Sequence, residues 1–458
     1  MKTRLRELAQ HKHFVPLCLL VALLIRLSWV ALVDTQPVSD FRWYYERGVD
    51  LATGRGYSMG PDAYWPENLP PAALPSEAEY PADGRPTAYW PVGYPAFLGL
   101  LFALFGPSLL AAKLANILLY LGIMFLAYII AKRLFRSKFV GRMTLLVLVF
   151  CPNHIAYSSL LASESLFLFL LLLAVAAVLT PTKPKLWLFV ASGVLFGLAC
   201  LVKPQALLVP AIIFMASLAT DIKEGWLWKR VARFAVLYLA LGLTILPWII
   251  RNYRVFDDFV LISNNGGINL LVGNNPYAPG AYGQHQQMAA MLSDVRGEHD
   301  RDVAARALAI DYMVSHPWET LKRWPNKVWY MYRKDVEGIS WNEQGMHFTQ
   351  GSHGKGVMLA LKAIAQGYYV LLVLAFFIFI ILYVSQNHIQ PHDQALPALG
   401  LWMALYFTVI SLLTFGDTRF HFPVLPWMVM YAAALLEVAV RPIHLKGRTN
   451  GTVTSEVK

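Results

Sequence analysis

Ionisable side chains stand beside the ends of long apolar segments at five places in this sequence. They are Asp40, Glu164 in "LASESLFLFLL", Lys203 in "LVKPQALL", Arg251 in "LPWIIRNYRVF" and Arg419 in "FGDTRFHFPVLP". A charge near hydrocarbon is costly, so each of these residues is a functional hypothesis by default. Each cation can also simply reach into the membrane interface, and Glu164 can pair with one of them. Two acids and three cations that converge from distant points of the chain suit a reaction centre for an anionic, lipid-anchored substrate.

The composition places these residues in a membrane protein. Hydrophobic residues make up 57% of the 458 residues and charged residues only 15%, and the mean hydropathy is +0.47. These values exceed what a soluble domain carries. The formal net charge of +11 does not indicate a nucleic-acid partner, because the basic residues form short clusters between apolar segments. The three cysteines, Cys18, Cys151 and Cys200, lie in apolar runs without the spacing of metal ligands or of a disulfide framework.

Apolar runs of about 20 residues, enough to cross a bilayer, recur about ten times. The predicted spans are residues 14–33, 108–131, 142–157, 160–179, 186–202, 204–220, 234–250, 357–383, 396–415 and 422–440. Lys and Arg form clusters before the first span, after even-numbered spans and after the last span. By the positive-inside rule, these clusters place both chain ends in the cytoplasm. These basic residues are Lys2, Arg4, Arg6, Lys12, Lys132, Arg133, Arg136, Lys138, Arg142, Lys183, Lys185, Lys223, Lys229, Arg230, Arg233, Arg441, Lys446 and Arg448.

This topology predicts an all-α polytopic membrane protein with two large outer loops. Its parts are a cytoplasmic N-terminus (1–13), a first transmembrane helix (14–33), a first outer loop with interfacial helices (34–107), a transmembrane bundle of about six helices (108–250), a second outer loop (251–356), a bundle of about three helices (357–440) and a cytoplasmic tail (441–458). Both loops are too long and too polar to be ordinary turns. We therefore expect the function to reside in them.

Each outer loop carries a characteristic stretch. The first leads through "PTAYWPVGYPAFLGLLFALFG" into an apolar segment that is too short to span and suits a helix in the membrane interface. The second contains "NNGGINLLVGNNPYAPGAYG", whose glycines permit tight turns and whose amides can hydrogen-bond hydroxyl groups. A stretch rich in Trp and Tyr follows, which predicts amphipathic helices at the level of the lipid headgroups.

Several of these stretches together resemble a known family. An Asp soon after the first span, "YYERGVDLATGRGY", "YWPVGYPAFLGLLFALFG", "SESLF", "LVKPQALLVP", "PWIIRNYRVFDDFVLISNNGGINLLVGNNPYA" and "RFHFPVLPWMVMYAA" are similar to the bacterial C-type glycosyltransferases related to protein O-mannosyltransferases. The lipid A aminoarabinose transferases are also similar. The resemblance covers nearly the whole chain and implies the GT-C fold. It further implies an enzyme that passes a sugar from a polyprenyl phosphate to an acceptor on the outer side.

The resemblance also implies roles for individual residues. The acid in the first outer loop of such enzymes is the catalytic base, which by position is Asp40. Protein mannosyltransferases place a second acid directly after it, whereas Phe41 follows here, which puts a protein acceptor in doubt. The cation before a proline, often Arg, is here Lys203, and the last outer turn contains Arg419 followed by Phe420 and His421. Positive charge is kept in both places.

A mechanism follows from this chemistry. Polyprenyl phosphate leaves readily if fixed cations neutralise it, and Lys203, Arg251 and Arg419 are the candidates. Asp40 would accept the proton of the attacking hydroxyl group, and a single displacement would invert the anomeric carbon. Glu164 would orient Asp40, contact sugar hydroxyls or help to hold a divalent cation. The sequence requires no cofactor and leaves the metal open.

Other side chains are predicted to contact the sugar or the lipid, although aromatic residues can also serve as plain interface anchors. They are Tyr44, Tyr45, Tyr89, Trp90, Asn265, Asn269 and Asn274. The predicted partners are a sugar donor linked to polyprenyl phosphate, an acceptor that is a lipid, glycan or protein, and membrane lipids, without nucleic acid. The predicted location is the bacterial inner membrane with the site on the outer face. The alternative is a transporter or flippase for a lipid-linked sugar, but such proteins place their polar residues near the middle of the bilayer.

Overall fold

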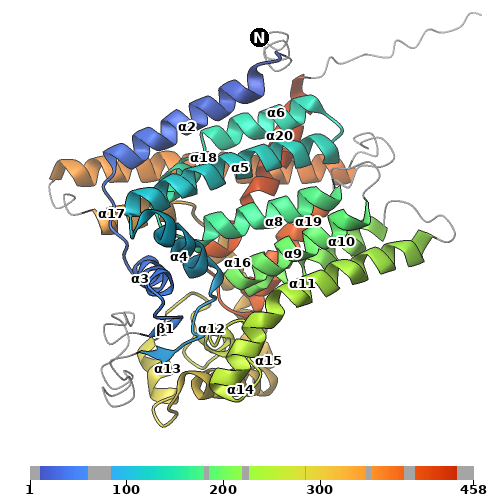
Figure 1. Cartoon of the computed structure of the whole chain (residues 1–458). Coiled ribbons are helices and arrows are strands. Elements are labelled where there is room, and N and C mark those ends of the chain that lie inside the picture. Colours follow the sequence, from blue (N-terminus) through green and yellow to red (C-terminus); the bar gives the residue numbers. More distant parts are fainter. Residues whose placement is uncertain are drawn as a thin grey trace, which may run out of the picture.

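A computed structural model gives the fold of the chain (Figure 1). It describes residues 11–59, 84–179, 185–218, 226–283, 285–346, 352–385 and 398–440. The Pro-rich part of the first predicted outer loop (60–83) and the predicted tail (441–458) lie outside the described residues. So do several of the basic residues that set the predicted topology: Lys2, Arg4, Arg6, Lys183, Lys223, Arg441, Lys446 and Arg448.

Helices make up most of the described chain. The first half contains α2 (Phe14–Leu32), α3 (Asp40–Ala52), β1 (Ser58–Met59), β2 (Arg85–Pro86), α4 (Gly93–Phe105), α5 (Leu109–Leu134), α6 (Lys138–Val149), α7 (Pro152–Ala156), η3 (Tyr157–Ser159), α8 (Ser163–Leu179), α9 (Leu186–Val202), η4 (Pro204–Ala206) and α10 (Val209–Leu218). The second half contains α11 (Trp226–Phe256), α12 (Gly266–Gly273), α13 (His285–Met291), α14 (Glu298–Ser315), α15 (Pro317–Lys322), α16 (Trp324–Tyr332), α17 (Glu337–Gly345), α18 (Ser352–Ser385), α19 (Leu399–Leu413), η5 (Thr418–His421) and α20 (Leu425–Val440). The short antiparallel pair β1–β2 is the only sheet in the described ranges.

Every predicted span contains a helix, but the helices differ in length. By length and apolar composition, four described helices are long enough to cross a membrane: α2, α5, α11 and α18. The bent pair formed by α6 with the α7–η3 segment makes a fifth candidate. Six further apolar helices, from α4 to α20, are shorter than 18 residues. A helix of 17 residues such as α8 or α9 is about 25 Å long, somewhat less than the hydrocarbon thickness.

The segment predicted as a continuous span over residues 142–157 is instead broken. Helix α6 ends at Val149 and the chain turns by 56° before continuing at Pro152. Proline lacks an amide hydrogen and disfavours the helical conformation of the residue before it, and Cys151 is indeed extended. The side chain of Arg26 fills this break, since its Nη atoms donate to the carbonyl oxygens of Leu148 and Val149 at 3.5 and 3.4 Å. The backbone carbonyls freed by the proline therefore solvate a cation inside the bundle.

The helix at the centre of the bundle is buried, whereas a helix at its rim exposes apolar side chains, as expected in a membrane. Helix α8 is buried along nearly its whole length between α5 and α9. By contrast, α2 exposes Leu17, Leu20 and Leu24, which is expected of a helix that faces lipid. Helix α9 approaches α11 closely at Gly193, where a Cβ atom would lie 2.2 Å from the carbonyl oxygen of Leu237. Small residues allow such close contact between membrane helices.

The two predicted outer loops contribute the remaining helices, and they gather at one end of the bundle. Figure 1 shows α3, β1 and α12 to α15 on the same side of the molecule. Helices α12, α13 and α14 share a small apolar cluster that includes Leu271, Met288, Ala305 and Phe415. Because Phe415 belongs to the turn between α19 and α20, this lobe packs directly on the turn that carries Arg419.

Candidate active site

Four of the five predicted charged residues meet in one cluster, with Arg419 in the middle. Its Nη1 atom lies 2.7 Å from Oδ2 of Asp40, and its Nε atom lies 2.7 Å from Oε1 of Glu164. The Nζ atom of Lys203 lies 3.0 Å from the same Glu164 oxygen. Residues separated by hundreds of positions in the chain thus form a continuous chain of ion pairs.

Local structure fixes each member of the cluster at the end of a helix. Asp40 is the first residue of α3, and Ser39 before it has a positive φ of 53°, which is uncommon for a residue other than glycine. Glu164 lies in the first turn of α8, where the helix dipole favours a negative charge. Lys203 ends α9 in an extended conformation because Pro204 follows it. Arg419 lies in the short helix η5, whose start is capped by Asp417.

The cluster is largely removed from solvent. Glu164 is 1% exposed and Asp40 is 9% exposed. Buried charges are stable only when they are paired, and here two carboxylates face two cations. Within the described part of the chain, Oε2 of Glu164 has no hydrogen-bond partner, and Arg419 donates to the two carboxylates through Nε and Nη1. Oε2 of Glu164 can therefore accept a further hydrogen bond without breaking the cluster.

Aromatic side chains of the first outer loop extend from the cluster. Tyr44 follows Asp40 by one helical turn and packs its ring against Trp90 and Tyr94, with centroid distances of 5.9 and 5.5 Å. Burial, together with the charge of Asp40, raises the pKa of Tyr44, so its phenol stays protonated. Tyr89 contacts the ring of Trp90 at 5.3 Å. Tyr44 thus lies next to Asp40, and ring contacts connect it through Trp90 to Tyr89.

Tyr45 points elsewhere. Its hydroxyl group donates to the carbonyl oxygen of Pro107 at 2.9 Å, and its ring packs on Phe102 of α4. This arrangement holds α3 against α4 and the start of α5. Tyr45 therefore has a packing role, and its contact with sugar or lipid stays a prediction.

The predicted asparagines lie in and around α12. Asn274 is buried, and its amide donates to the carbonyl oxygens of Leu270 and Leu413 while its oxygen accepts from Lys327. These bonds join α12 to the end of α19 and leave the amide no donor for a substrate hydroxyl. Asn265 precedes α12 and accepts a hydrogen bond from Ser263, whereas Asn269 lies within the helix.

Arg251 does not join the ion-pair cluster. Its Nη1 and Nη2 atoms donate to the carbonyl oxygens of Thr87 and Tyr57, each at 2.8 Å, and its guanidinium group stacks on the ring of Trp248. Arg251 thus fastens the first outer loop to the end of α11.

Glu298 of the second outer loop strengthens the same junction. Its carboxylate accepts from the hydroxyl group of Thr87, from the amide of Ala88 at 2.8 Å and from Asn264 at 3.0 Å. Burial raises the pKa of Glu298. The placement of Tyr89 and Trp90, which follow Thr87 and Ala88 in the chain, therefore depends on Arg251 and Glu298.

Replacing Arg251 by Gln should destabilise the protein rather than weaken its hold on a phosphate. A glutamine cannot reach both carbonyls, and an unpaired buried carbonyl costs about 1–3 kcal/mol. We expect a lower temperature of unfolding and an affinity for polyprenyl phosphate that changes less than about twofold. Thermal unfolding and lipid binding of the purified variant check both expectations. A loss of lipid affinity at unchanged stability would contradict this expectation and show that Arg251 binds the donor.

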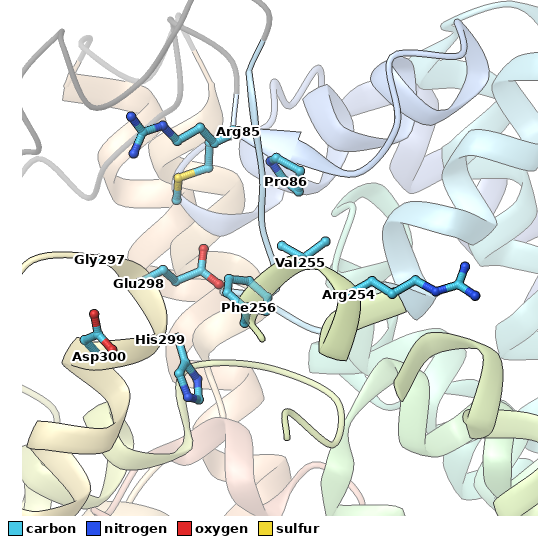
Figure 2. A pocket seen from close by; sticks show the side chains of 10 residues that line it. Arg85, Pro86, Arg254, Val255, Phe256, Gly297, Glu298, His299 and Asp300 are labelled. Carbon is cyan, nitrogen blue, oxygen red and sulfur yellow. The ribbon is translucent and has the colours of Figure 1, made fainter. Parts of the chain in front are cut away.

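A cavity of about 580 Å³ lies at this junction and not at the charged cluster. It is lined by Met59, Arg85, Pro86, Arg254, Val255, Phe256, Gly297, Glu298, His299 and Asp300. Figure 2 shows the side chain of Arg254 extending away from Glu298, His299 and Asp300. The side chains of Glu298 and His299 are hydrogen-bonded to neighbouring residues, so these two lining residues serve the junction itself. The described ranges also contain no group of three or more His, Cys, Asp or Glu side chains that could hold a metal ion.

Two parts of the site were missed by sequence reasoning. Tyr282 is 51% exposed, and its ring packs on Phe415 while the adjacent backbone pairs with Gly416. His421 and Asp335 form a buried pair behind Arg419, with 3.2 Å between Nε2 and Oδ1. No sequence pattern predicts these contacts, because the residues come from distant segments and meet only in the folded chain.

Comparisons with known proteins agree with this fold. Residues 90–250 match the model of a family described as dolichyl-phosphate-mannose-protein mannosyltransferase. No curated protein sequence matches the chain. Among solved structures, an apo oligosaccharyltransferase from Archaeoglobus fulgidus has a TM-score of 0.54 at 14% identity, over 93% of this chain and 51% of that chain. The same archaeal enzyme, AglB, in complex with an inhibitory peptide and a dolichol-phosphate has a TM-score of 0.53 at 15% identity, over 93% and 50%.

A third similar structure is ArnT from Cupriavidus metallidurans bound to undecaprenyl phosphate, with a TM-score of 0.41 at 14% identity over 94% of this chain and 79% of that chain. The chain spans about half the length of the archaeal enzyme. The predicted fold class is thus confirmed: the chain is an all-α, multi-span membrane protein with the GT-C fold. The chain resembles the mannosyltransferase family named above, and it also resembles the archaeal oligosaccharyltransferase and ArnT.

Proposed function

We propose that this protein is an inverting glycosyltransferase that moves a sugar from a polyprenyl phosphate to an acceptor hydroxyl group on the outer face of the membrane. The ion-pair cluster of Asp40, Arg419, Glu164 and Lys203 carries the proposal. It combines a carboxylate able to accept a proton with cations able to neutralise a phosphate. The match to a family that uses dolichyl-phosphate-mannose, and the dolichol-phosphate in AglB, support a lipid-linked donor.

In the proposed reaction, the acceptor oxygen attacks the anomeric carbon as the bond from that carbon to the phosphate oxygen breaks. The proton of the hydroxyl group moves to Asp40, and the charge released on the phosphate is stabilised by Arg419 and Lys203. Attack and departure on opposite sides of the carbon invert it. Glu164 holds both cations through one oxygen and so fixes their positions. Each step uses only residues of this chain.

The outer-face location and the bacterial inner membrane belong to the same proposal. Their support is the distribution of basic residues, which assigns α3, the start of α8, the end of α9 and η5 to one side of the membrane. The acceptor remains one of three classes: a lipid, a glycan or a protein.

The proposal is tested by donor consumption. Purified protein in lipid nanodiscs is incubated with polyprenyl phosphates that carry radiolabelled sugars and with candidate lipid, glycan and peptide acceptors. Labelled acceptor and free polyprenyl phosphate should accumulate together, and much less so with Asp40→Asn. Movement of the intact donor across proteoliposome membranes, without cleavage, would overturn the proposal in favour of a flippase.

A further inference from the structure

The turn that carries Arg419 is held from behind by a buried histidine. His421 is 1% exposed, and its Nδ1 atom lies 2.6 Å from the carbonyl oxygen of Met331 in α16. Its Nε2 atom lies 3.2 Å from Oδ1 of Asp335, which is itself 4% exposed. The imidazole ring is stacked between Tyr332 and Tyr369, at centroid distances of 6.0 and 5.1 Å and an angle of 25° to each ring.

The neighbours of this pair hold both of its members in place. A backbone carbonyl only accepts, so the hydrogen bond between Nδ1 of His421 and Met331 requires a hydrogen on Nδ1. Asn153 accepts the amide hydrogen of Gly338 with its oxygen, at 2.7 Å, and its NH₂ group donates to Oδ1 of Asp335. The same oxygen of Asp335 therefore faces both Asn153 and His421.

The surroundings leave this arrangement little freedom. A Cβ atom at Gly338 would lie 2.7 Å from Oδ1 of Asn153 and 2.7 Å from the ring of Tyr157, so only glycine allows the approach. The pair thus ties η5 to three other elements: α7 through Asn153, the end of α16 through Met331, and the segment before α17 through Asp335. Two of these elements belong to the second outer loop.

The other end of the turn is fixed as well. Asp417 accepts from the backbone amide of Arg419 at 2.8 Å, and Gly416 donates to the carbonyl oxygen of Gly280 at 2.7 Å. With both ends held, the guanidinium group reaches Asp40 and Glu164 at 2.7 Å each. Contacts of this length tolerate little movement of the backbone that carries them.

We infer that the buried His421–Asp335 pair is a positioning device that holds Arg419 in register with Asp40 and Glu164. His421 acts through Arg419 and not on the substrate, because its two ring nitrogens are both taken by the protein. The expected effect of His421 on turnover rests on the proposed function. The expected effect of His421 on the geometry of Arg419 does not rest on it.

The test replaces His421 by Gln, which keeps a polar side chain but cannot bridge Met331 and Asp335. A misplacement of the reacting groups by about 1 Å costs up to about a hundredfold, so we expect kcat to fall about ten- to a hundredfold. His316→Gln, the same substitution at an exposed histidine outside the site, should leave kcat unchanged. Asp335→Asn, in which His421 is kept, should retain part of the activity, because the hydrogen bond from Nδ1 of His421 to the carbonyl oxygen of Met331 remains.

A double-mutant cycle separates positioning from general damage. If His421 acts through Arg419, His421→Gln should have less than about a twofold effect on kcat in an Arg419→Lys background. Fully additive losses would overturn the inference. If the wild-type protein transfers no sugar at all, the proposed function fails, and a structure of His421→Gln then decides the inference alone. Intact ion pairs from Arg419 to Asp40 and Glu164 in that structure would contradict it.

Discussion

Replacing Asp40 by Asn should lower kcat by about a hundred- to ten-thousand-fold while polyprenyl phosphate still binds, because the amide keeps the size of the side chain but cannot accept a proton. The structure sharpens this expectation. Asp40 uses one carboxylate oxygen to accept from Arg419, and an asparagine oxygen can still accept that hydrogen bond. Binding and chemistry should therefore separate in this variant. The measurement is donor consumption by purified protein, alongside its affinity for sugar-free polyprenyl phosphate.

Asp50→Asn is the matched control, since Asp50 lies on the same helix α3. Ten residues of helix place it about 15 Å from Asp40. Its carboxylate pairs with Arg47 at 2.9 Å and with Arg55 at 2.6 Å, so it holds the loop together. We expect the Asp50 variant to lose stability but to keep its turnover per folded molecule. Near-normal turnover in Asp40→Asn would rule out the proposed mechanism.

The sequence predicts the depth at which a charged residue lies in the membrane better than the direction in which its side chain points. Asp40, Glu164, Lys203 and Arg251 all lie at predicted ends of apolar segments, but only the first three belong to the ion-pair cluster with Arg419. Hydrophobicity reveals where a helix leaves the membrane. It does not reveal which side of the helix faces the site, and Arg251 turns to the carbonyls of Thr87 and Tyr57 instead.

The broken span shows that the sequence contains a helix-ending signal, Pro152, which the count of apolar residues outweighs. Apolar residues continue through 142–157, so their count predicts one span, whereas Pro152 and the extended Cys151 end the helix. The cation that fills this break, Arg26, lies within the first apolar run and shows no sequence relation to Val149. Pairs such as Arg26 with this break, or His421 with Asp335, depend on the packing of distant segments and have no local pattern.

The arrangement of charges in the site explains why replacing Arg419 should have a larger effect than replacing Lys203. Arg419 is the only member of the four-residue cluster that contacts both carboxylates. Lys203 contacts Glu164 alone. Removal of Arg419 would leave Asp40 without a cation and Glu164 with Lys203 alone, although both carboxylates are buried.

Replacing Arg419 by Gln should therefore reduce both donor binding and turnover. A hydrogen bond to a charged group is worth about 1.5–3 kcal/mol, so the affinity for polyprenyl phosphate should fall about ten- to a hundredfold. The value of kcat should fall further, because the leaving phosphate is more charged in the transition state than in the bound donor. Arg419→Lys keeps the charge without the forked geometry and should recover part of the binding but little of the turnover.

Arg42→Gln is the matched control for this prediction. Arg42 lies on α3 close to Asp40 in sequence, but its ion pair with Glu46 is a surface pair between neighbouring turns of the helix. Such pairs contribute only about 0–1 kcal/mol, so its loss should leave donor affinity within about fivefold. Equilibrium binding of sugar-free polyprenyl phosphate to the three purified variants provides the measurement. If Arg419→Gln binds this lipid as well as Arg42→Gln does, Arg419 holds the two carboxylates in place without binding the phosphate.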